Sequence, residues 1–270
     1  MEELLTKQQK LISELKEQGS IAVAFSGGVD SALLLKTAHD ALGDNAVAFT
    51  LATDFFPDKE TEEAVSFCRR YGIKHELIYE DILSVHGIKS NPVNRCYICK
   101  KHMFRLLKVR AAALGIKYVA EGSNADDAGD FRPGMKAIEE LGIKSPLKSA
   151  GLTKDDIRAL ANKAGLSVWD KPSAACLASR FIYGEELTKE RLSSVEKAEE
   201  MIRSYGVRQL RVRVHGDLAR IETGKEDIKK LTVPDVSESI CRYLKDLGFL
   251  YVTLDLGGYR TGSMNESIKK

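Results

Sequence analysis

A glycine-rich turn near the start of the chain constrains the fold more than any other stretch. It reads Ser26-Gly27-Gly28-Val29-Asp30-Ser31, and it joins an apolar run at 21–25 to a helical pattern that continues through 32–38. The apolar run is typical of a buried strand. Glycines let a backbone approach an anion closely, and the first N–H groups of a helix point toward that anion. The turn therefore predicts a phosphate-binding loop, with an ordinary strand-to-helix turn as the alternative. It lacks the Gly-Lys-Ser/Thr sequence of a Walker A loop.

Strands and helices alternate through the first part of the chain, which predicts the α/β fold class with a parallel sheet. The expected strands are 21–25, 46–51, 75–79 and 117–122, and the expected helices are 3–18, 31–42, 58–72 and 99–114. Ligands of such sheets bind at the carboxyl ends of the strands. That rule places the loop 53–56, which begins with Thr53, and the segment 122–127, which begins with Gly122, around one crevice with the glycine loop.

The pattern changes after Lys148, where a smaller α+β domain is expected. A polar stretch with a proline, 170–180, suggests a domain junction, so we predict domains at 1–168 and 169–270. Two alternating segments, 210–215 and 218–222, predict a β-hairpin.

Composition limits the classes of partner. The chain is 43% hydrophobic and 30% charged, its start is acidic, and it has no apolar run of membrane-spanning length. We therefore expect a cytoplasmic enzyme. A net charge of +2 argues against a nucleic acid partner. Five cysteines, an odd number, argue against a disulfide framework and for metal or redox chemistry.

The cysteine pair Cys96-Tyr97-Ile98-Cys99 lies just before an expected helix. Thiols at a helix N-terminus are shifted toward the thiolate form, which binds metal. The pair alone fits a redox couple or half a zinc site equally well. With Cys176, three thiolates suit an iron–sulfur cluster that leaves one iron open. A structural zinc would need a fourth ligand, which His102 or Cys241 could supply.

Two arginines alternate along one expected strand. Arg211 and Arg213 should emerge on the same face, with Glu222 on the neighbouring strand and Arg180 in a nearby loop. Guanidinium groups bind phosphates in a planar, two-pronged geometry. The set predicts a seat for a phosphate monoester, and a solvated strand face is the alternative.

Several motifs carry a family resemblance. The glycine loop resembles the SGGxDS loop of the ATP pyrophosphatases (PP-loop enzymes), which split ATP into AMP and pyrophosphate. Together with four further motifs it resembles the LarE family of ATP-dependent sulfur transferases, nearly end to end. The further motifs are Asp130-Phe131-Arg132-Pro133-Gly134, Ser179-Arg180-Phe181, the 211–213 and 219–222 strands, and Leu254-Asp255-Leu256-Gly257-Gly258-Tyr259-Arg260.

The resemblance implies a reaction and a set of site residues. ATP would activate the carboxylates of pyridinium-3,5-biscarboxylic acid mononucleotide, which then become thiocarboxylates for a nickel-pincer cofactor. It implies a homo-oligomer such as a hexamer. ATP would bind at Ser26, Gly27, Gly28, Val29, Asp30, Ser31, Thr53 and Gly122, with Asp30 on Mg²⁺ and Lys100 countering phosphate charge. The substrate phosphate would be held by Arg180, Arg211, Arg213 and Arg260, with Glu199 and Glu222 orienting these groups.

The source of sulfur separates two branches of this family. In one branch a cysteine gives up its own sulfur; the matching position here is Ala175, and Cys176 follows it. In the other branch three cysteines hold a [4Fe-4S] cluster, and Cys96, Cys99 and Cys176 fit that pattern. The sequence thus favours the cluster branch, with sulfur donation by Cys176 still open. The rivals are a cluster-dependent tRNA thiolase, an amidating ligase of the NAD-synthetase kind, and a non-catalytic nucleotide-binding protein.

Overall fold

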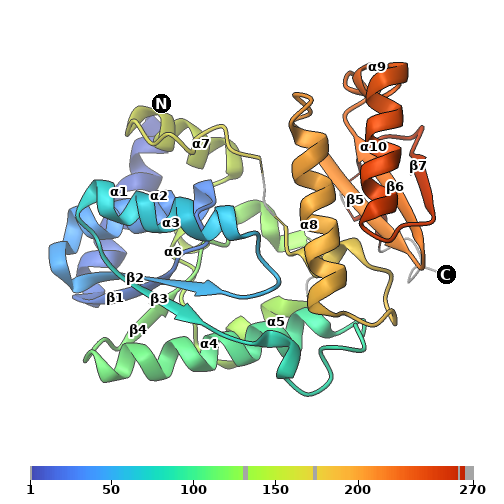
Figure 1. Ribbon diagram of the computed structural model, residues 1–270. Coiled ribbons are helices and arrows are strands. Elements are labelled where there is room, and N and C mark those ends of the chain that lie inside the picture. Colours follow the sequence, from blue (N-terminus) through green and yellow to red (C-terminus); the bar gives the residue numbers. More distant parts are fainter. Residues whose placement is uncertain (1, 130–132, 173–174, 261, 265–270) are drawn as a thin grey trace. The chain divides into compact units, whose positions relative to one another are not determined.

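The computed structural model describes residues 2–129, 133–172, 175–260 and 262–264 (Figure 1). Its residues form two compact units. Unit 1 comprises 1–53, 58–81 and 94–173, and unit 2 comprises 54–57, 82–93 and 174–270. Two short segments from the first half of the chain therefore belong to the unit that the C-terminal residues build. The boundary expected between 168 and 169 remains a prediction.

Unit 1 is built on a four-stranded parallel sheet in the order β3-β2-β1-β4. The strands are β1 (Ile21–Ala24), β2 (Ala46–Ala52), β3 (Lys74–Tyr79) and β4 (Tyr118–Ala120). Ile21 is in register with Ala46 on one side and with Tyr118 on the other. This confirms the predicted fold class. Because β1 has β2 on one side and β4 on the other, the strand order reverses beside β1, and ligands of such sheets bind at the carboxyl ends of the strands at this reversal.

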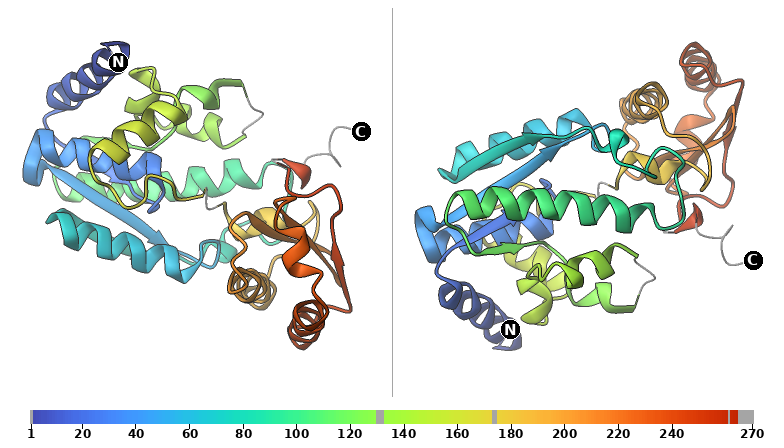
Figure 2. Two further views of the ribbon diagram at one scale, coloured as in Figure 1. Left: turned by 90° about the horizontal axis from the view of Figure 1, so that it is seen from above. Right: turned by 90° about the horizontal axis from the view of Figure 1, so that it is seen from below.

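Helices cover both faces of this sheet. The helices of unit 1 are α1 (Glu2–Gln18), α2 (Val29–Leu42), α3 (Asp58–Tyr71), α4 (Arg95–Ala113), α5 (Pro133–Glu140), α6 (Pro146–Ser149) and α7 (Lys154–Lys163). Right-handed crossovers place α2 and α3 on one face, and the reversed direction of the β3-to-β4 connection places α4 on the other. Figure 2 shows α4 in front of the sheet in the view from below.

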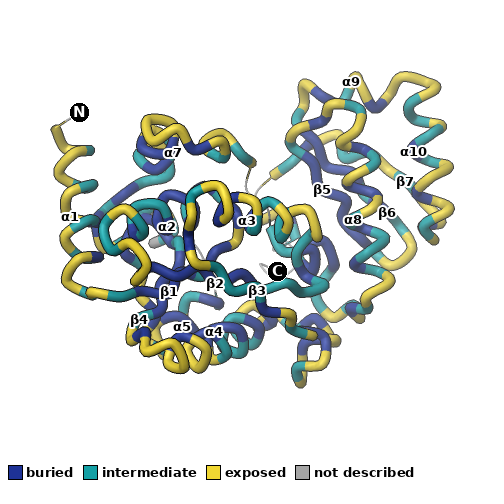
Figure 3. The backbone as a smooth tube through the Cα atoms, turned by 60° about the vertical axis from the view of Figure 1, so that its left-hand side comes forward, coloured by how far each residue is buried: buried dark blue, intermediate teal, exposed yellow. Residues whose placement is uncertain are grey.

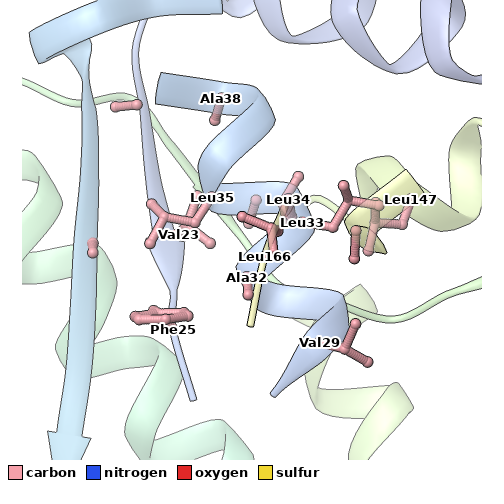
Figure 4. Packing of buried hydrophobic residues seen from close by; sticks show 14 of the residues in the cluster. Val23, Phe25, Val29, Ala32, Leu33, Leu34, Leu35, Ala38, Leu147 and Leu166 are labelled. Carbon is pink, nitrogen blue, oxygen red and sulfur yellow. The ribbon is translucent and has the colours of Figure 1, made fainter. Parts of the chain in front are cut away.

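Alternate residues of β1 feed two separate hydrophobic clusters. Ile21 and Val23 pack with α1, α2, α3 and α7, whereas Ala22 packs with Phe104 and Leu107 of α4. Figure 4 shows Val23 beside Leu35 of α2, close to the start of the glycine loop. Most residues of β1 and β2 are buried, as Figure 3 shows, whereas β3 at the edge of the sheet is mostly half-buried or exposed. The glycine loop therefore rests on a rigid base.

Unit 2 contains a three-stranded mixed sheet in the order β5-β6-β7. Its elements are α8 (Lys189–Arg203), β5 (Leu210–His215), β6 (Leu218–Thr223), α9 (Ile228–Leu231), α10 (Pro234–Asp246) and β7 (Tyr251–Leu254). The predicted hairpin is confirmed, because β5 and β6 pair antiparallel with Arg211 opposite Glu222. The short 3-10 helix Leu177–Arg180 precedes α8.

The segments 54–57 and 82–93 join unit 2 through backbone hydrogen bonds. The Leu177 N–H donates to the Phe55 carbonyl at 2.8 Å, and the Leu187 N–H donates to the Lys89 carbonyl at 2.8 Å. Asn91 is buried, has a positive φ of 47°, and its amide donates to the Ile182 carbonyl at 2.7 Å. These loops follow β2 and β3, so parts of two connections between elements of unit 1 belong to unit 2.

Helix α4 differs from the prediction. It begins at Arg95, after Asn94 as the N-cap residue, so both cysteines of the pair lie within its first two turns. Among the helices that the structure describes, none is long and apolar enough to cross a membrane.

Candidate functional site

The glycine loop turns directly from β1 into the first turn of α2. Gly28 is the N-cap residue of α2 and offers no side-chain cap, so the first N–H groups of the helix are not capped by it. The Ser31 hydroxyl donates to the Gly28 carbonyl at 3.1 Å and lies 3.2 Å from the Ser26 hydroxyl. These bonds fix a tight turn whose N–H groups can receive an anion.

Gly27 is the position in the loop that requires glycine. Its φ is +74°, and an added Cβ would lie 3.3 Å from the Glu60 carbonyl oxygen of α3. Lys171 reaches the same place: its ammonium donates to the Gly27 carbonyl at 3.3 Å and pairs with Glu60 and Glu63 at 2.6 Å. Burial lowers the pKa of Lys171, but the two carboxylates outweigh burial and raise it above 10.5. The loop is thus held against α3.

The segment after β4 lies directly against the loop. A Cβ at Gly122 would be 3.0 Å from the backbone nitrogen of Ser31, so any larger residue would crowd the first turn of α2. Asn124 is buried, and its amide donates to Asp30 Oδ1 at 3.1 Å. The structure therefore brings Gly122 together with the loop at the strand-order reversal. Thr53 directly follows β2 and is half-buried.

Asp30 has a second partner that the sequence did not suggest. Lys154, the first residue of α7, forms an ion pair with Asp30 Oδ2. The two side chains are 34% and 22% exposed, so solvent still reaches the pair. Asn124 belongs to the segment 122–127 that the strand-end rule places at this crevice, whereas no local pattern marks Lys154, which contacts Asp30 across more than 90 residues of sequence.

Lys100 lies on α4 and packs along α5. A Cβ added at Gly134 would be 2.7 Å from Lys100 Cδ, so the Lys100 side chain lies directly against the Gly134 backbone. In the part of the chain that the structure describes, the ion pair of Asp30 is with Lys154 and not with Lys100. The expected motif 130–134 lies outside the described residues at 130–132.

The cysteine pair offers two thiols at the start of α4. Cys96 is exposed and Cys99 is buried, and residues three apart on a helix are neighbours on its surface. The two thiols could therefore bind one metal centre. Cys176 is half-buried and belongs to unit 2. Within the described ranges no group of three or more His, Cys, Asp or Glu side chains is arranged to hold a metal ion.

The other cysteines and the alternative zinc ligand have different surroundings. Burial raises the pKa of Cys68 to about 12, which keeps this thiol protonated. His102 on α4 pairs with Glu80 at 2.7 Å. Cys241 lies half-buried on α10.

In unit 2, Arg180 and Glu199 form a fully buried ion pair. Both are 2% exposed, and the guanidinium binds the carboxylate through Nε at 2.8 Å and a terminal nitrogen at 2.9 Å. The other terminal nitrogen of Arg180 donates to the Ala175 and Cys176 carbonyls at 2.6 and 3.1 Å. Burial raises the pKa of Glu199, but Arg180 outweighs burial and holds that pKa at about 2. Arg180 thereby ties the Cys176 backbone to α8.

The hairpin carries a second buried ion pair beside the first. Arg213 Nε binds Glu222 at 2.9 Å, and its terminal nitrogen donates to the Ser179 carbonyl at 3.1 Å. Glu222 is 0% exposed and also accepts from Arg220 at 2.9 Å and from the Ser263 hydroxyl at 2.8 Å. The structure places Glu222 on the same face as Arg211 and Arg213, as expected from the alternation.

Among the described residues, three buried arginines and two buried carboxylates lie in this part of unit 2. Arg180, Arg211 and Arg213 are buried, against the two carboxylates Glu199 and Glu222. Burial and the neighbouring Arg180 lower the pKa of Arg211 to about 10, and burial lowers the pKa of Arg213. Burial disfavours a charged guanidinium, and an anion placed beside it stabilises the charged form.

The C-terminal motif contributes Arg260 and Tyr259 to unit 2. The Arg211 guanidinium lies over the Tyr259 ring, 5.4 Å from its centroid. Arg260 lies 3.6 Å from Asp255 and donates to the Gly258 carbonyl at 3.2 Å. The motif thus packs against the first of the two hairpin arginines.

Known proteins resemble the chain at two levels. The NAD synthase family matches residues 3–94, which include the glycine loop. An uncharacterized protein of Synechocystis is 42% identical over 99% of this chain and 100% of its own length. An uncharacterized protein of Methanocaldococcus jannaschii is 32% identical over 95% of this chain and 98% of its own.

A third relative has a named activity. The pyridinium-3,5-bisthiocarboxylic acid mononucleotide synthase of Lactiplantibacillus plantarum is 41% identical over 100% of this chain and 98% of its own length. The similarity extends over the sequence of both units. The chain therefore belongs to the family of this synthase, the LarE family of the PP-loop enzymes.

Proposed function

We propose that the protein is an ATP-dependent sulfur transferase that converts the carboxylates of a pyridinium mononucleotide into thiocarboxylates for nickel-pincer cofactor biosynthesis. The full-length similarity to the synthase of Lactiplantibacillus plantarum carries this proposal. Two features of the structure support it: a loop built to receive phosphates in unit 1, and a cluster of buried arginines in unit 2.

The first step uses the glycine loop. The N–H groups at the start of α2 would bind the ATP phosphates, and the carboxylate of Asp30 would bind Mg²⁺, which prefers oxygen ligands. A carboxylate oxygen of the substrate attacks the α-phosphorus, and the bond to the leaving pyrophosphate breaks. The product is an acyl-adenylate, in which AMP replaces a poor leaving group. Positive side chains, with the Mg²⁺ that Asp30 would hold, would stabilise the charge that builds on pyrophosphate.

The substrate phosphate would bind at the arginine cluster. Arg211 and Arg213 lie on the inner face of the hairpin, and Arg260 belongs to the neighbouring motif. Most N–H groups of Arg180 donate to Glu199 or to backbone carbonyls. Arg180 would therefore add positive charge near the phosphate and hold Glu199 and the backbone at 175 in place. Glu199 and Glu222 would orient the arginines. A phosphate monoester would place negative charge beside the buried guanidinium groups.

Sulfide then attacks the activated carbonyl carbon, and AMP leaves with the bonding electron pair. Cys96, Cys99 and Cys176 would hold a [4Fe-4S] cluster; three thiols without a carboxylate are a donor set that suits iron–sulfur ligation. The cluster would supply sulfide as a bound nucleophile. The first two ligands are neighbours on α4, and the third comes from the segment that Arg180 fixes through the Cys176 carbonyl.

Pyrophosphate exchange tests the ATP step. With the pyridinium dicarboxylate mononucleotide present, the protein should exchange labelled pyrophosphate into ATP, and Asp30→Ala should abolish the exchange. Asp40→Ala is a matched control, because Asp40 lies on the same helix and pairs with Lys36 at the surface. Full exchange by Asp30→Ala would remove the loop from the mechanism.

Iron content and product mass test the sulfur step. Protein reconstituted without oxygen should bind about four irons per chain, and Cys96→Ala, Cys99→Ala or Cys176→Ala should lower that content sharply, whereas Cys241→Ala should not. Unchanged iron in the first three variants would remove the ligand assignment. Conversion of Cys176 during turnover to a residue lighter by the mass of H₂S would instead identify Cys176 as the sulfur donor.

We also propose that the protein works in the cytoplasm as a homo-oligomer. Light scattering of the purified chain measures the oligomer, and a monomer at working concentration would contradict this part.

A further inference from the structure

The ion pair between Lys154 and Asp30 occupies the carboxylate that the proposed function needs for Mg²⁺. Asp30 Oδ2 pairs with Lys154 and Oδ1 accepts from Asn124, so both carboxylate oxygens have partners. A carboxylate neutralised by an ammonium group attracts a second cation weakly. The ion pair therefore disfavours the binding of a free metal ion at Asp30.

The backbone of Lys154 is firmly anchored, whereas its side chain has room to move. Its N–H donates to Asp126 Oδ2 at 2.7 Å, and α7 starts with a capping box between Thr153 and Asp156. Lys7 of α1 pairs with Asp156 at 2.9 Å and adds a further tie. The Lys154 side chain itself is 34% exposed, and its ammonium group is carried by a flexible four-carbon chain. Its ammonium can therefore change partners within one small region.

We propose that Lys154 is a phosphate-binding residue that holds Asp30 while the site is empty and exchanges it for the ATP phosphates when metal–ATP binds. This inference rests on the proposed use of ATP at the glycine loop. After the exchange, Asp30 binds the metal and Lys154 binds a phosphate oxygen, so neither charge is left without a counter-charge. Lys154 then adds positive charge where pyrophosphate leaves.

The exchange predicts that removing the Lys154 side chain has opposite effects on the affinity for free metal and on the affinity for metal–ATP. Lys154 competes with a free metal ion for Asp30, so its removal should tighten the binding of free metal. Lys154 contacts the phosphates of metal–ATP, so its removal should weaken that binding. A residue that only stabilised the fold would weaken both.

Mn²⁺ is a suitable probe, because its magnetic resonance signal reports free and bound ion directly. We expect Lys154→Met to bind free Mn²⁺ about fivefold more tightly than wild type, a change of about 1 kcal/mol. We expect it to bind Mn–ATP about tenfold more weakly, measured by calorimetry. Lys154→Arg should shift both constants less, because it keeps the positive charge.

Two controls assign the effects to this contact. Lys36→Met removes a lysine that pairs with Asp40 on the same helix as Asp30, and it should leave both constants at their wild-type values. Asp30→Asn in the Lys154→Met background should remove the gain in free Mn²⁺ binding. A gain that persists without Asp30 would overturn the proposal.

The outcomes separate the two levels of inference. If the wild type binds Mn–ATP but both constants move in the same direction in Lys154→Met, the role of Lys154 is wrong and ATP use stands. If the wild type does not bind Mn–ATP at all, the proposed ATP site fails, and the role of Lys154 fails with it.

Discussion

Replacing Glu199 by glutamine removes a negative charge from the centre of unit 2. Its carboxylate accepts from Arg180 at 2.8 and 2.9 Å, from Arg203 at 2.8 Å and from the Val212 N–H at 3.1 Å. Arg180 is 2% exposed, so in the variant its buried cation loses the partner that compensates it. We expect Glu199→Gln to be destabilised strongly.

The magnitude follows from the depressed pKa of Glu199. Its value of about 2 in the folded protein lies well below the ordinary 4.5. At about 1.4 kcal/mol per pKa unit, the charged form contributes about 3 kcal/mol to folding at pH 7. Arg203 is 42% exposed and is screened by solvent, so Arg180 provides most of this contribution.

The pH dependence has a definite sign. Because the folded pKa is lowered, the contribution is fully present above the unfolded value of 4.5 and is lost as the pH falls toward 2. The stability gap between wild type and Glu199→Gln should therefore be about 3 kcal/mol at pH 7 and less than half of that near pH 3.

Urea unfolding followed by circular dichroism measures this gap at several pH values. Hydrogen exchange of the Val212 amide gives a local check that does not depend on how the two units unfold. Glu200→Gln is the matched control, because Glu200 is the exposed neighbour on the same helix. A Glu199→Gln variant as stable as Glu200→Gln at pH 7, or a gap that stays constant from pH 7 to pH 3, would refute the reasoning.

Three further substitutions test other contacts of the two units. Gly27→Ala and the control Gly72→Ala should each lower the free energy of unfolding by about 1 kcal/mol, because both glycines have a positive φ. Only Gly27→Ala should also weaken ATP binding, measured by calorimetry, because only there would the new Cβ crowd Glu60. Equal ATP affinities in the two variants would contradict this. Lys171→Met should lower the unfolding temperature by leaving two carboxylates together, and adding Glu60→Gln should recover part of the loss; no recovery would argue against charge as the cause. Arg213→Lys should raise KM for the mononucleotide about tenfold but not KM for its dephosphorylated nucleoside; an equal rise for both would place the phosphate elsewhere.

Much of the fold follows from local patterns. Apolar runs of strand length alternate with helical periods, and only a parallel sheet connects them with short crossovers. The hairpin was predictable because Arg211, Arg213 and Glu222 alternate with apolar residues, which fixes their common face. The capping box at Thr153 and Asp156 is likewise a local signature, and the structure confirms it.

The contacts that tune the site were not predictable in this way. Lys154 and Lys171 reach the glycine loop from positions far along the chain, and their local sequences resemble ordinary helix starts or loops. The partners of Arg180 illustrate the same limit: its sequence motif suggested a phosphate ligand, whereas packing gives it a buried carboxylate and two carbonyls. The start of α4 was also missed, because a cysteine pair has no strong helix preference of its own.

The assignment of 54–57 and 82–93 to unit 2 has a consequence for biosynthesis. Phe55, Ile82, Leu83 and Ile88 are nearly inaccessible to solvent in the finished molecule. Their unit is completed by residues from 174 onward, which leave the ribosome much later. During synthesis these four apolar side chains stay exposed until residues from 174 onward are made, whereas the strands that precede them can already pair. The nascent chain thus exposes two apolar loops while about 100 further residues are made, at about 5–20 residues per second. A chaperone would protect the chain from aggregation most effectively during this interval.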